Sequence, residues 1–385
     1  MAHVRSGRWA FVVDHSLLLV AGAVAGLLWA NIGPASYERT AAALHFPVND
    51  IGMVFFFALA AKEILEARLP GGPLASAREA AVPLLAAAGG MVVPAALYAL
   101  LVHRAGRPEL FRGWAIPCAT DIAFSYLAVR LIFPKDHPAI PFLLLLAIAD
   151  DALGLVLLAA FYPAGPLSPA LFAGLMAPAL ALGWWLKRRR IRSAWPYVAG
   201  AGSLSWAALH FGGLHPALAL VPVLPFMPHA ARDMGLFDAR EEDQPDTMNA
   251  FERGWKVPVQ FVLFFFGLAN AGVPLSGVGA GTWIVLASLV AGKPAGVLGA
   301  TLLAARAGFP APGGLNRADL LVVGIAAGTG LTVALFFATA AFPPGATLDE
   351  VKMGALLSFA AAPLAIAVSW LLRRPGTAPP AQGPL

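Results

Sequence analysis

The sequence has little charge and almost no cysteine for its length. Asp, Glu, Lys and Arg make up 12% of its 385 residues, about half the share found in an average soluble domain. The single cysteine, Cys118, excludes an intramolecular disulfide framework. Cysteine and histidine are also absent beside the acidic pair Asp150–Asp151, which argues against a zinc or copper site there. The low charge indicates that the chain is not a soluble protein.

The sequence instead contains many long runs of apolar residues. Hydrophobic residues make up 59% of the chain, and apolar runs of about 20 residues recur, each long enough to cross a hydrocarbon core of about 30 Å. We therefore expect an all-α polytopic membrane protein with one transmembrane domain over residues 1–373. About twelve spans are predicted by length and hydropathy, at residues 12–31, 49–66, 78–101, 112–133, 139–160, 167–186, 195–211, 214–227, 255–272, 282–305, 318–342 and 352–372.

The basic residues indicate how the chain is oriented. An even number of spans places both termini on one side, and most loop Lys and Arg residues, including the run Lys187–Arg192, lie on that side. The positive-inside rule then predicts cytoplasmic termini in a prokaryotic inner membrane. The net charge of +5 follows from this topology, so we expect no nucleic-acid partner. Residues 228–254 are interpreted as a solvated linker, and residues 375–385, rich in proline and small residues, as a disordered tail.

Two predicted spans carry helix-breaking residues near their centres. Pro117 removes a backbone donor just before Thr120-Asp121, and Gly328 and Gly330 flank Thr329. Backbone groups freed at membrane depth must line a cavity or meet another buried group. Matched breaks in two halves of a transporter indicate inverted repeats around a central site. Spans 3–5, at about 78–160, and spans 10–12, at about 282–372, would be the paired repeats.

Asp150 and Asp151 lie at the centre of the apolar stretch 143–159. Holding one ionised carboxylate at mid-depth costs about 2.5–3.5 kcal/mol on insertion scales, so such a pair indicates a function. On a helix the two side chains point about 100° apart, so one can face a cavity while the other meets a neighbouring helix. Two close carboxylates also titrate as a coupled unit, which suits a protein that takes up and releases protons.

Other buried polar groups supply partners for this pair. Asp121 lies mid-span in the preceding helix, and with Thr120 and the freed carbonyls it would complete an oxygen-rich site for a hard cation. Lys293 also lies mid-span and needs a counter-ion, which either Asp150 or Asp151 could supply; a static structural ion pair is the alternative. Glu63, near the end of its span, is either functional or an interfacial charge. No cofactor is expected.

Several motifs in these regions are similar to those of one transporter family. They are GWAIPCATDIAF at 113–124, LAIADDALG at 146–154, GLANAGVPL at 267–275 and GKPAG at 292–296, supported by GGMVVPA at 89–95 and GTGLT at 328–332. Together they resemble the NhaA family of sodium/proton antiporters over nearly the whole chain. That resemblance implies twelve helices, with the fourth and eleventh unwound and crossing at mid-membrane. It also implies electrogenic exchange, with more protons entering than Na⁺ or Li⁺ ions leaving.

The resemblance also implies roles for individual residues. Asp150 and Asp151 match the ion-binding acid pair, and Asp121 matches the acid on the unwound fourth helix, with Thr120 beside it as an extra ligand. Lys293 matches the lysine that pairs with the first acid, here Asp150. The family's glutamates for pH response at the cytoplasmic funnel are matched by Glu63 and Glu252.

This sequence departs from the family in two places. The segment 32–50 looks shorter than in the best-known members, where it carries a β-hairpin that supports a homodimer, so a homodimer stays open here. Arg253 and Lys256 stand where histidines are expected after Glu252, which would alter pH sensing.

The main hypothesis is Na⁺(Li⁺)/H⁺ antiport through Asp150 and Asp151, which is transport rather than catalysis. One rival is an ion-coupled symporter of an organic solute, which needs a larger cavity. A second is an intramembrane aspartyl protease using Asp121 and Asp150 as a proton-sharing pair. The GxGD context of such proteases is missing, and an intramembrane lysine would be unexplained.

Overall fold

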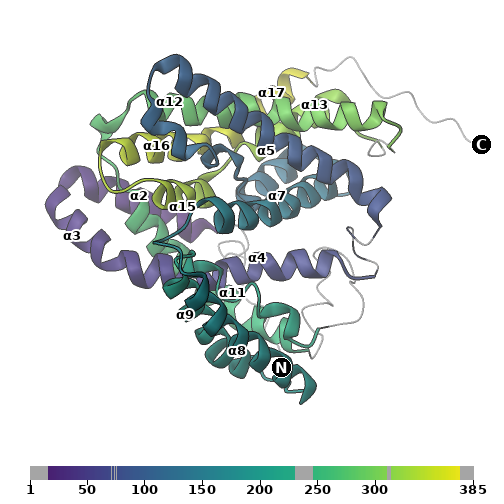
Figure 1. The fold of residues 1–385 in the computed structure, drawn as a ribbon. Helices are drawn as coiled ribbons and strands as arrows, with labels where there is room; N and C mark the ends of the chain where they lie inside the picture. Colours follow the sequence, from purple (N-terminus) through teal and green to yellow (C-terminus); the bar gives the residue numbers. More distant parts are fainter. Residues whose placement is uncertain are drawn as a thin grey trace, which may run out of the picture.

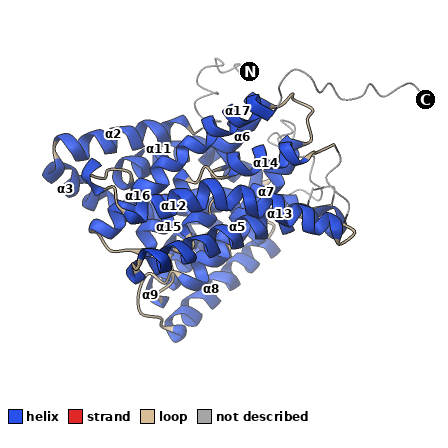
Figure 2. Cartoon of the chain, turned by 90° about the horizontal axis from the view of Figure 1, so that it is seen from above, coloured by secondary structure: helices blue, strands red, loops and turns tan. Residues whose placement is uncertain are grey.

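The described part of the chain is built from helices and loops. The computed structural model describes residues 16–70, 72, 74, 76–229, 246–309 and 314–372. Within these ranges no strand occurs, and helices pack side by side in one bundle (Figure 2). The expected tail at 375–385 and most of the expected linker at 228–254 lie outside the described residues.

The elements follow one another with short connections, and η marks a 3₁₀ or π-helical segment. In chain order they are α2 (Leu17–Ile32), α3 (Pro34–His45), η1 (Phe46–Gly52), α4 (Met53–Ala67), α5 (Ala77–Ala105), η2 (Pro108–Gly113), η3 (Ile116–Cys118), α6 (Ile122–Ile132), α7 (Ala139–Phe161), α8 (Pro169–Arg188), η4 (Pro196–Gly202), α9 (Ser203–Gly212), η5 (Pro216–Leu218), η6 (Leu224–Phe226), α11 (Thr247–Asn270), η7 (Leu275–Gly277), α12 (Ala280–Ala287), η8 (Ser288–Gly292), α13 (Lys293–Arg306), α14 (Arg317–Ala327), α15 (Leu331–Ala341), α16 (Ala346–Leu357), η9 (Ser358–Ala360) and α17 (Ala361–Leu372).

Helix length and composition confirm a multi-pass membrane protein. Six described helices are long and apolar enough to cross a membrane, and two bent helix pairs raise the number to eight. They coincide with predicted spans 2–6 and 10–12. The predicted spans 1, 7 and 9 are occupied by α2, η4 with α9, and α11. The helix predicted for the eighth span is wrong, because residues 214–227 form short 3₁₀ turns, η5 and η6, instead.

The segment between the first two spans is helical rather than extended. α3, η1 and α4 join into one helix over Pro34–Ala67. Pro34 lies in the first turn, where its missing donor costs nothing, and alanines fill the middle of α3. Pro47 cannot donate a hydrogen bond within the continuing helix, and the chain there takes π-helical geometry in η1. The described residues of this segment therefore contain no β-hairpin.

Two groups of helices lie on either side of α4. In Figure 1, α5, α12, α13 and α17 lie on one side of α4, and α8 and α9 on the other. α5 and α13 pack backbone to backbone, because a Cβ placed on Gly296 would lie 2.1 Å from the carbonyl oxygen of Gly89. This contact joins the two segments predicted to be repeats, whose symmetry stays a prediction. α7 lies between α4 and α5 and carries the acidic pair.

Candidate functional site

Two spans are broken at the middle of the bundle. The segment Pro108–Cys118 meets α6 at 54°, and α14 meets α15 at 50°. The first break follows the 3₁₀ turn η3, which contains Pro117, and the second runs from Gly328 to Gly330. Proline and glycine therefore end the helices where the sequence predicted.

The two breaks contact each other directly. The backbone N–H of Asp121 donates to the carbonyl oxygen of Thr329 at 2.7 Å. The hydroxyl of Thr120 lies 3.1 Å from the carbonyl oxygen of Ala327. Backbone groups freed at the breaks thus find partners on the opposite broken helix, as burial at membrane depth requires. The predicted crossing of spans 4 and 11 is confirmed.

Asp121 faces the start of α15. Its Oδ2 accepts the backbone N–H of Thr332 at 3.2 Å and also the hydroxyl of the same residue. A carboxylate at a helix N-terminus is stabilised by the unpaired N–H groups and the positive end of the helix dipole. Asp121 is 6% exposed, so this end of the crossing holds a buried acid whose charge is already compensated.

Lys293 compensates the opposite end of the crossing. It is fully buried, and its Nζ lies 2.9 Å from Oδ2 of Asp150 and donates to the carbonyl oxygen of Cys118 at 2.6 Å. That carbonyl is one that the break after η3 leaves without a helical partner. Of the two acids that could pair with Lys293, the structure places Asp150 beside it, as the resemblance implied.

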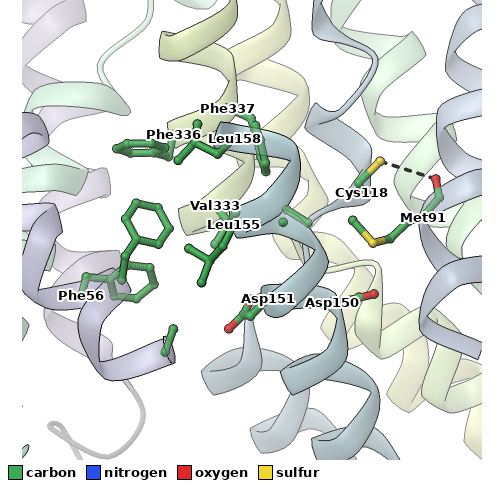
Figure 3. A pocket seen from close by; sticks show the side chains of 14 residues that line it. Phe56, Met91, Cys118, Asp150, Asp151, Leu155, Leu158, Val333, Phe336 and Phe337 are labelled. Carbon is green, nitrogen blue, oxygen red and sulfur yellow. Dashed lines mark hydrogen bonds between the residues drawn. The ribbon is translucent and has the colours of Figure 1, made fainter. Parts of the chain in front are cut away.

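Asp150 and Asp151 lie side by side on α7 but differ in surroundings. Oδ2 of Asp150 accepts from the hydroxyl of Thr120 at 2.7 Å and from Lys293, whereas its buried Oδ1 has no hydrogen-bond partner. Asp151 is half-buried, and within the described residues no hydrogen bond or ion pair reaches its carboxylate. In Figure 3 the two carboxylates point to opposite sides of α7, Asp150 toward Met91 and Asp151 toward Phe56.

A small cavity touches both acids. A water-sized sphere can place its centre in a volume of about 20 Å³, which is room for about one water molecule. The lining is apolar apart from the acids and comprises Phe56, Phe57, Ala60, Met91, Cys118, Ala119, Asp150, Asp151, Gly154, Leu155, Leu158, Val333, Phe336 and Phe337. Such a cavity has space for a small ion with few waters.

Aromatic rings form the wall of the cavity on the side of α15. The rings of Phe57 and Phe336 meet edge to face with centroids 4.9 Å apart. Phe337 packs against Tyr162 at 5.4 Å, and the Tyr162 hydroxyl donates to the carbonyl oxygen of Arg112 at 2.9 Å. Edge-to-face packing of this kind closes the cavity on that side.

The two glutamates predicted to respond to pH do not have similar surroundings. Glu63 is exposed, one turn along α4 from the cavity residue Ala60. Glu252 instead forms an ion pair with Lys62, whose Nζ lies 2.5 Å from both Glu252 and Glu66. We refer to Lys62, Glu66 and Glu252 as the Lys62 cluster. Of this cluster, the sequence could have predicted only the pair of Lys62 and Glu66, from their i, i+4 spacing on a helix.

The three acids do not form one ligand cluster. The described ranges contain no group of three or more His, Cys, Asp or Glu side chains placed to share a metal ion. A joint site of Asp121, Asp150 and Asp151 stays a prediction, and in the structure the carboxylate of Asp121 accepts from Thr332. Sequence reasoning missed Thr332, although the GTGLT motif contains it, and it missed the Cys118 carbonyl, which carries no side-chain signal.

Known proteins match this chain over most of its length. The sequence model of the family described as Na⁺/H⁺ antiporter 1 matches residues 13–371. A protein of Pelobacter propionicus named Na⁺/H⁺ antiporter NhaA 2 is 47% identical over 370 residues, 94% of this chain and 96% of that protein. The Na⁺/H⁺ antiporter NhaA of Geobacter sulfurreducens is 47% identical over 355 residues, 90% of this chain and 92% of its own.

A solved structure supports the fold independently. The sodium proton antiporter MjNhaP1 of Methanocaldococcus jannaschii, at pH 8, aligns with 94% of this chain and 93% of its own at a TM-score of 0.55. Its sequence is 16% identical, so the likeness concerns the helical transporter fold alone.

Proposed function

This chain belongs to the Na⁺/H⁺ antiporter 1 family, and from that membership we propose that it exchanges Na⁺ for H⁺ at Asp150 and Asp151. One observation carries the assignment to these residues. Asp150 and Asp151 line one small cavity, and in the described part of the chain neither Oδ1 of Asp150 nor the carboxylate of Asp151 has a hydrogen-bond partner. Oxygen atoms of this kind are the ligands that hard cations prefer.

Competition for the same oxygens couples the two ions. When both acids are ionised, Na⁺ binds in the cavity that Asp150 and Asp151 line. When Asp151 is protonated, the cation loses its charged ligand and leaves. Because each ligand binds only the form it favours, the site carries one or the other across the membrane. No cofactor takes part in this exchange.

Lys293 gives the exchange its electrical character. It pairs with Oδ2 of Asp150, whereas Oδ1 has no partner. The ion pair between Lys293 and Asp150 can therefore form or break as Na⁺ or H⁺ binds at the site. If the protonated site carries more protons than the other form carries cations, each cycle moves net charge. Such movement gains about 2.3 kcal/mol per charge per 100 mV of membrane potential. Li⁺, which is also a small hard cation, is the expected second substrate.

Access from each side requires movement of the crossing. A backbone hydrogen bond from the N–H of Asp121 to the carbonyl oxygen of Thr329 joins the two breaks. Movement of this broken-helix unit against α4 and α11 would expose the acids to one side at a time. A prokaryotic inner membrane with both termini cytoplasmic is part of this proposal, and the distribution of basic residues supports it. A homodimer stays a prediction, and the helical segment at 34–52 would have to serve in place of a hairpin.

The cavity disfavours the two rival functions. A volume of about 20 Å³ holds about one water, whereas pockets for organic ligands reach about 300–1,000 Å³. An aspartyl protease needs two acids that share a proton. Asp121 and Asp150 instead bond separately to Thr332 and Lys293.

Proton flux in proteoliposomes tests the proposal. A ΔpH-sensitive dye is followed from mildly acidic to alkaline pH on addition of Na⁺, Li⁺ or K⁺. We expect Na⁺ and Li⁺ to collapse the gradient, K⁺ to have no effect, and Asp151→Asn to remove the response. Full exchange by folded Asp151→Asn would show that another group carries the ion. A response only to labelled organic solutes with Na⁺ would favour symport.

A further inference from the structure

Two sulfur atoms line the wall of the cation cavity beside Asp150. Met91 on α5 and Cys118 at the end of η3 both adjoin the cavity. They are 6% and 1% exposed, and the Cys118 thiol donates to the carbonyl oxygen of Met91 at 3.4 Å (Figure 3). Nothing in exchange of Na⁺ for H⁺ uses a thiol or a thioether, because hard cations prefer oxygen ligands.

An unpartnered oxygen points to a ligand at the same place. Asp150 is 3% exposed, and its Oδ1 has no hydrogen-bond partner. In Figure 3 Asp150 points to the side of α7 where Met91 and Cys118 lie. Thiol, thioether and one carboxylate oxygen form a ligand set that suits soft monovalent metal ions, since cysteine and methionine sulfur select ions such as Cu⁺.

We propose that Met91, Cys118 and Oδ1 of Asp150 form a soft-metal subsite that takes Ag⁺ from the cation cavity and thereby blocks it. Ag⁺ carries the charge of the transported ion, and its ionic radius lies between those of Na⁺ and K⁺, so it can enter where Na⁺ enters. On binding, the S–H bond of Cys118 breaks, an S–Ag bond forms, and the proton leaves to solvent. No atom changes its oxidation state.

The subsite should bind Ag⁺ tightly and Na⁺ only weakly. Thiolate and thioether contribute little to a hard ion, but they bind a soft one strongly. With a volume of about 20 Å³, the cavity cannot hold a second cation beside a bound one. Blocking of exchange rests on the proposed function, whereas binding of the metal does not.

Binding is therefore measured first and without transport. The purified full chain in detergent is titrated with silver nitrate in chloride-free buffer by calorimetry, and intact-mass spectrometry counts the bound ions. Because Cys118 is the single cysteine of the chain, loss of free thiol on titration reports this site alone. We expect one tightly bound Ag⁺ and release of about one proton per chain.

Matched variants separate the subsite from other sulfur. Cys118→Ser keeps a hydrogen-bond donor without the soft atom, and it should weaken Ag⁺ binding at least about 10–100-fold. Met91→Leu conserves volume and should weaken binding by roughly tenfold. Met176→Leu is the control, because Met176 is a buried methionine of α8 outside the cavity lining, and it should bind Ag⁺ as the parent does.

The outcomes decide the proposal separately from the function. Tight binding that survives Cys118→Ser, or that weakens equally in Met91→Leu and Met176→Leu, overturns the subsite. In proteoliposomes Ag⁺ should stop Na⁺-driven proton flux, and the flux of Cys118→Ser, relative to its own rate without Ag⁺, should resist it. Equal inhibition of the parent and of Cys118→Ser by Ag⁺ would overturn the proposal that Ag⁺ bound at this subsite blocks exchange. If the parent exchanges no Na⁺ at all, the proposed function fails while the binding data still decide the subsite.

Discussion

Two buried lysines of the described residues bind carboxylates, and their settings differ. Lys293 is fully buried at the crossing and pairs with one oxygen of Asp150, beside a cavity and a second acid that has no partner in the described ranges. Lys62 is 4% exposed and binds two carboxylates, Glu66 and Glu252, on α4 and α11. The same chemistry thus contributes to the proposed exchange site in one place and links two helices in the other. The two settings differ because only Lys293 has a second acid nearby, Asp151, that lines a cavity and has no partner in the described residues.

The largest effect should come from removing the free acid. Asp151→Asn keeps the size of the side chain but takes away the charge that has no protein partner, so Na⁺-driven proton flux should fall below detection. Its thermal stability in detergent should stay equal to or above that of the parent, because a half-buried, uncompensated charge is gone. Flux close to that of the parent, from protein that binds Na⁺, would place the exchange elsewhere.

Removing Lys293 should mainly cost stability. Lys293→Ala leaves Asp150 buried and uncompensated, and breaking a buried pair costs about 3–5 kcal/mol. Unfolding by denaturant in detergent measures the loss. The double variant Lys293→Ala with Asp150→Asn should recover most of it, since no buried charge then remains. Equal instability of single and double variants would mean that the lysine acts through packing alone.

The Lys62 cluster should respond differently. Lys62→Met leaves two carboxylates facing each other, and we expect a loss of about 2–3 kcal/mol, less than for Lys293 because Glu252 is partly exposed. Adding Glu252→Gln should restore part of the stability. Exchange should continue in both variants at neutral pH. If Lys62→Met abolished flux in folded protein, the cluster would belong to the exchange site.

The smallest effect is expected at Glu63. It is exposed, one turn from the cavity residue Ala60, and it lies among the charges of Lys62, Glu252 and Lys256, two of which oppose its own. Glu63→Gln should change the apparent Na⁺ affinity by less than about threefold, and the change should shrink as ionic strength rises. Dye assays at two salt concentrations check this. A large, salt-independent change would mean that Glu63 contacts the ion directly.

The sequence allowed the participants of the crossing to be predicted, but not all their pairings. Buried charges and helix breakers are costly in a membrane, so Asp121, Asp150 and Lys293 stood out without a structure. Which of them pair depends on how α7 is rotated about its own axis. Because α7 is apolar on all sides, its sequence does not specify that rotation. The residues alone therefore could not show whether Asp150 or Asp151 pairs with Lys293. Only the family resemblance favoured Asp150, which the structure places beside Lys293.

Backbone groups and short segments were the least predictable. The Cys118 carbonyl is free to accept a hydrogen bond from Lys293 because η3 ends at Cys118. Hydropathy could not separate a helix from 3₁₀ turns at 214–227, because both are apolar. The Lys62 cluster depends on α4 and α11 meeting, and contacts between distant segments leave little local trace in sequence.

The glycine contact between α5 and α13 limits which parts can move. Gly89 and Gly296 bring two backbones so close that a Cβ on Gly296 would lie 2.1 Å from the opposite carbonyl oxygen. Sliding by one residue would shift the helices about 1.5 Å along their axes and would bring Ala300, whose Cβ already borders Gly89, against main-chain atoms. Shear along this seam is sterically blocked. A rearrangement that keeps this contact would carry α5 and α13 together, with sliding at surfaces where side chains rather than backbones meet.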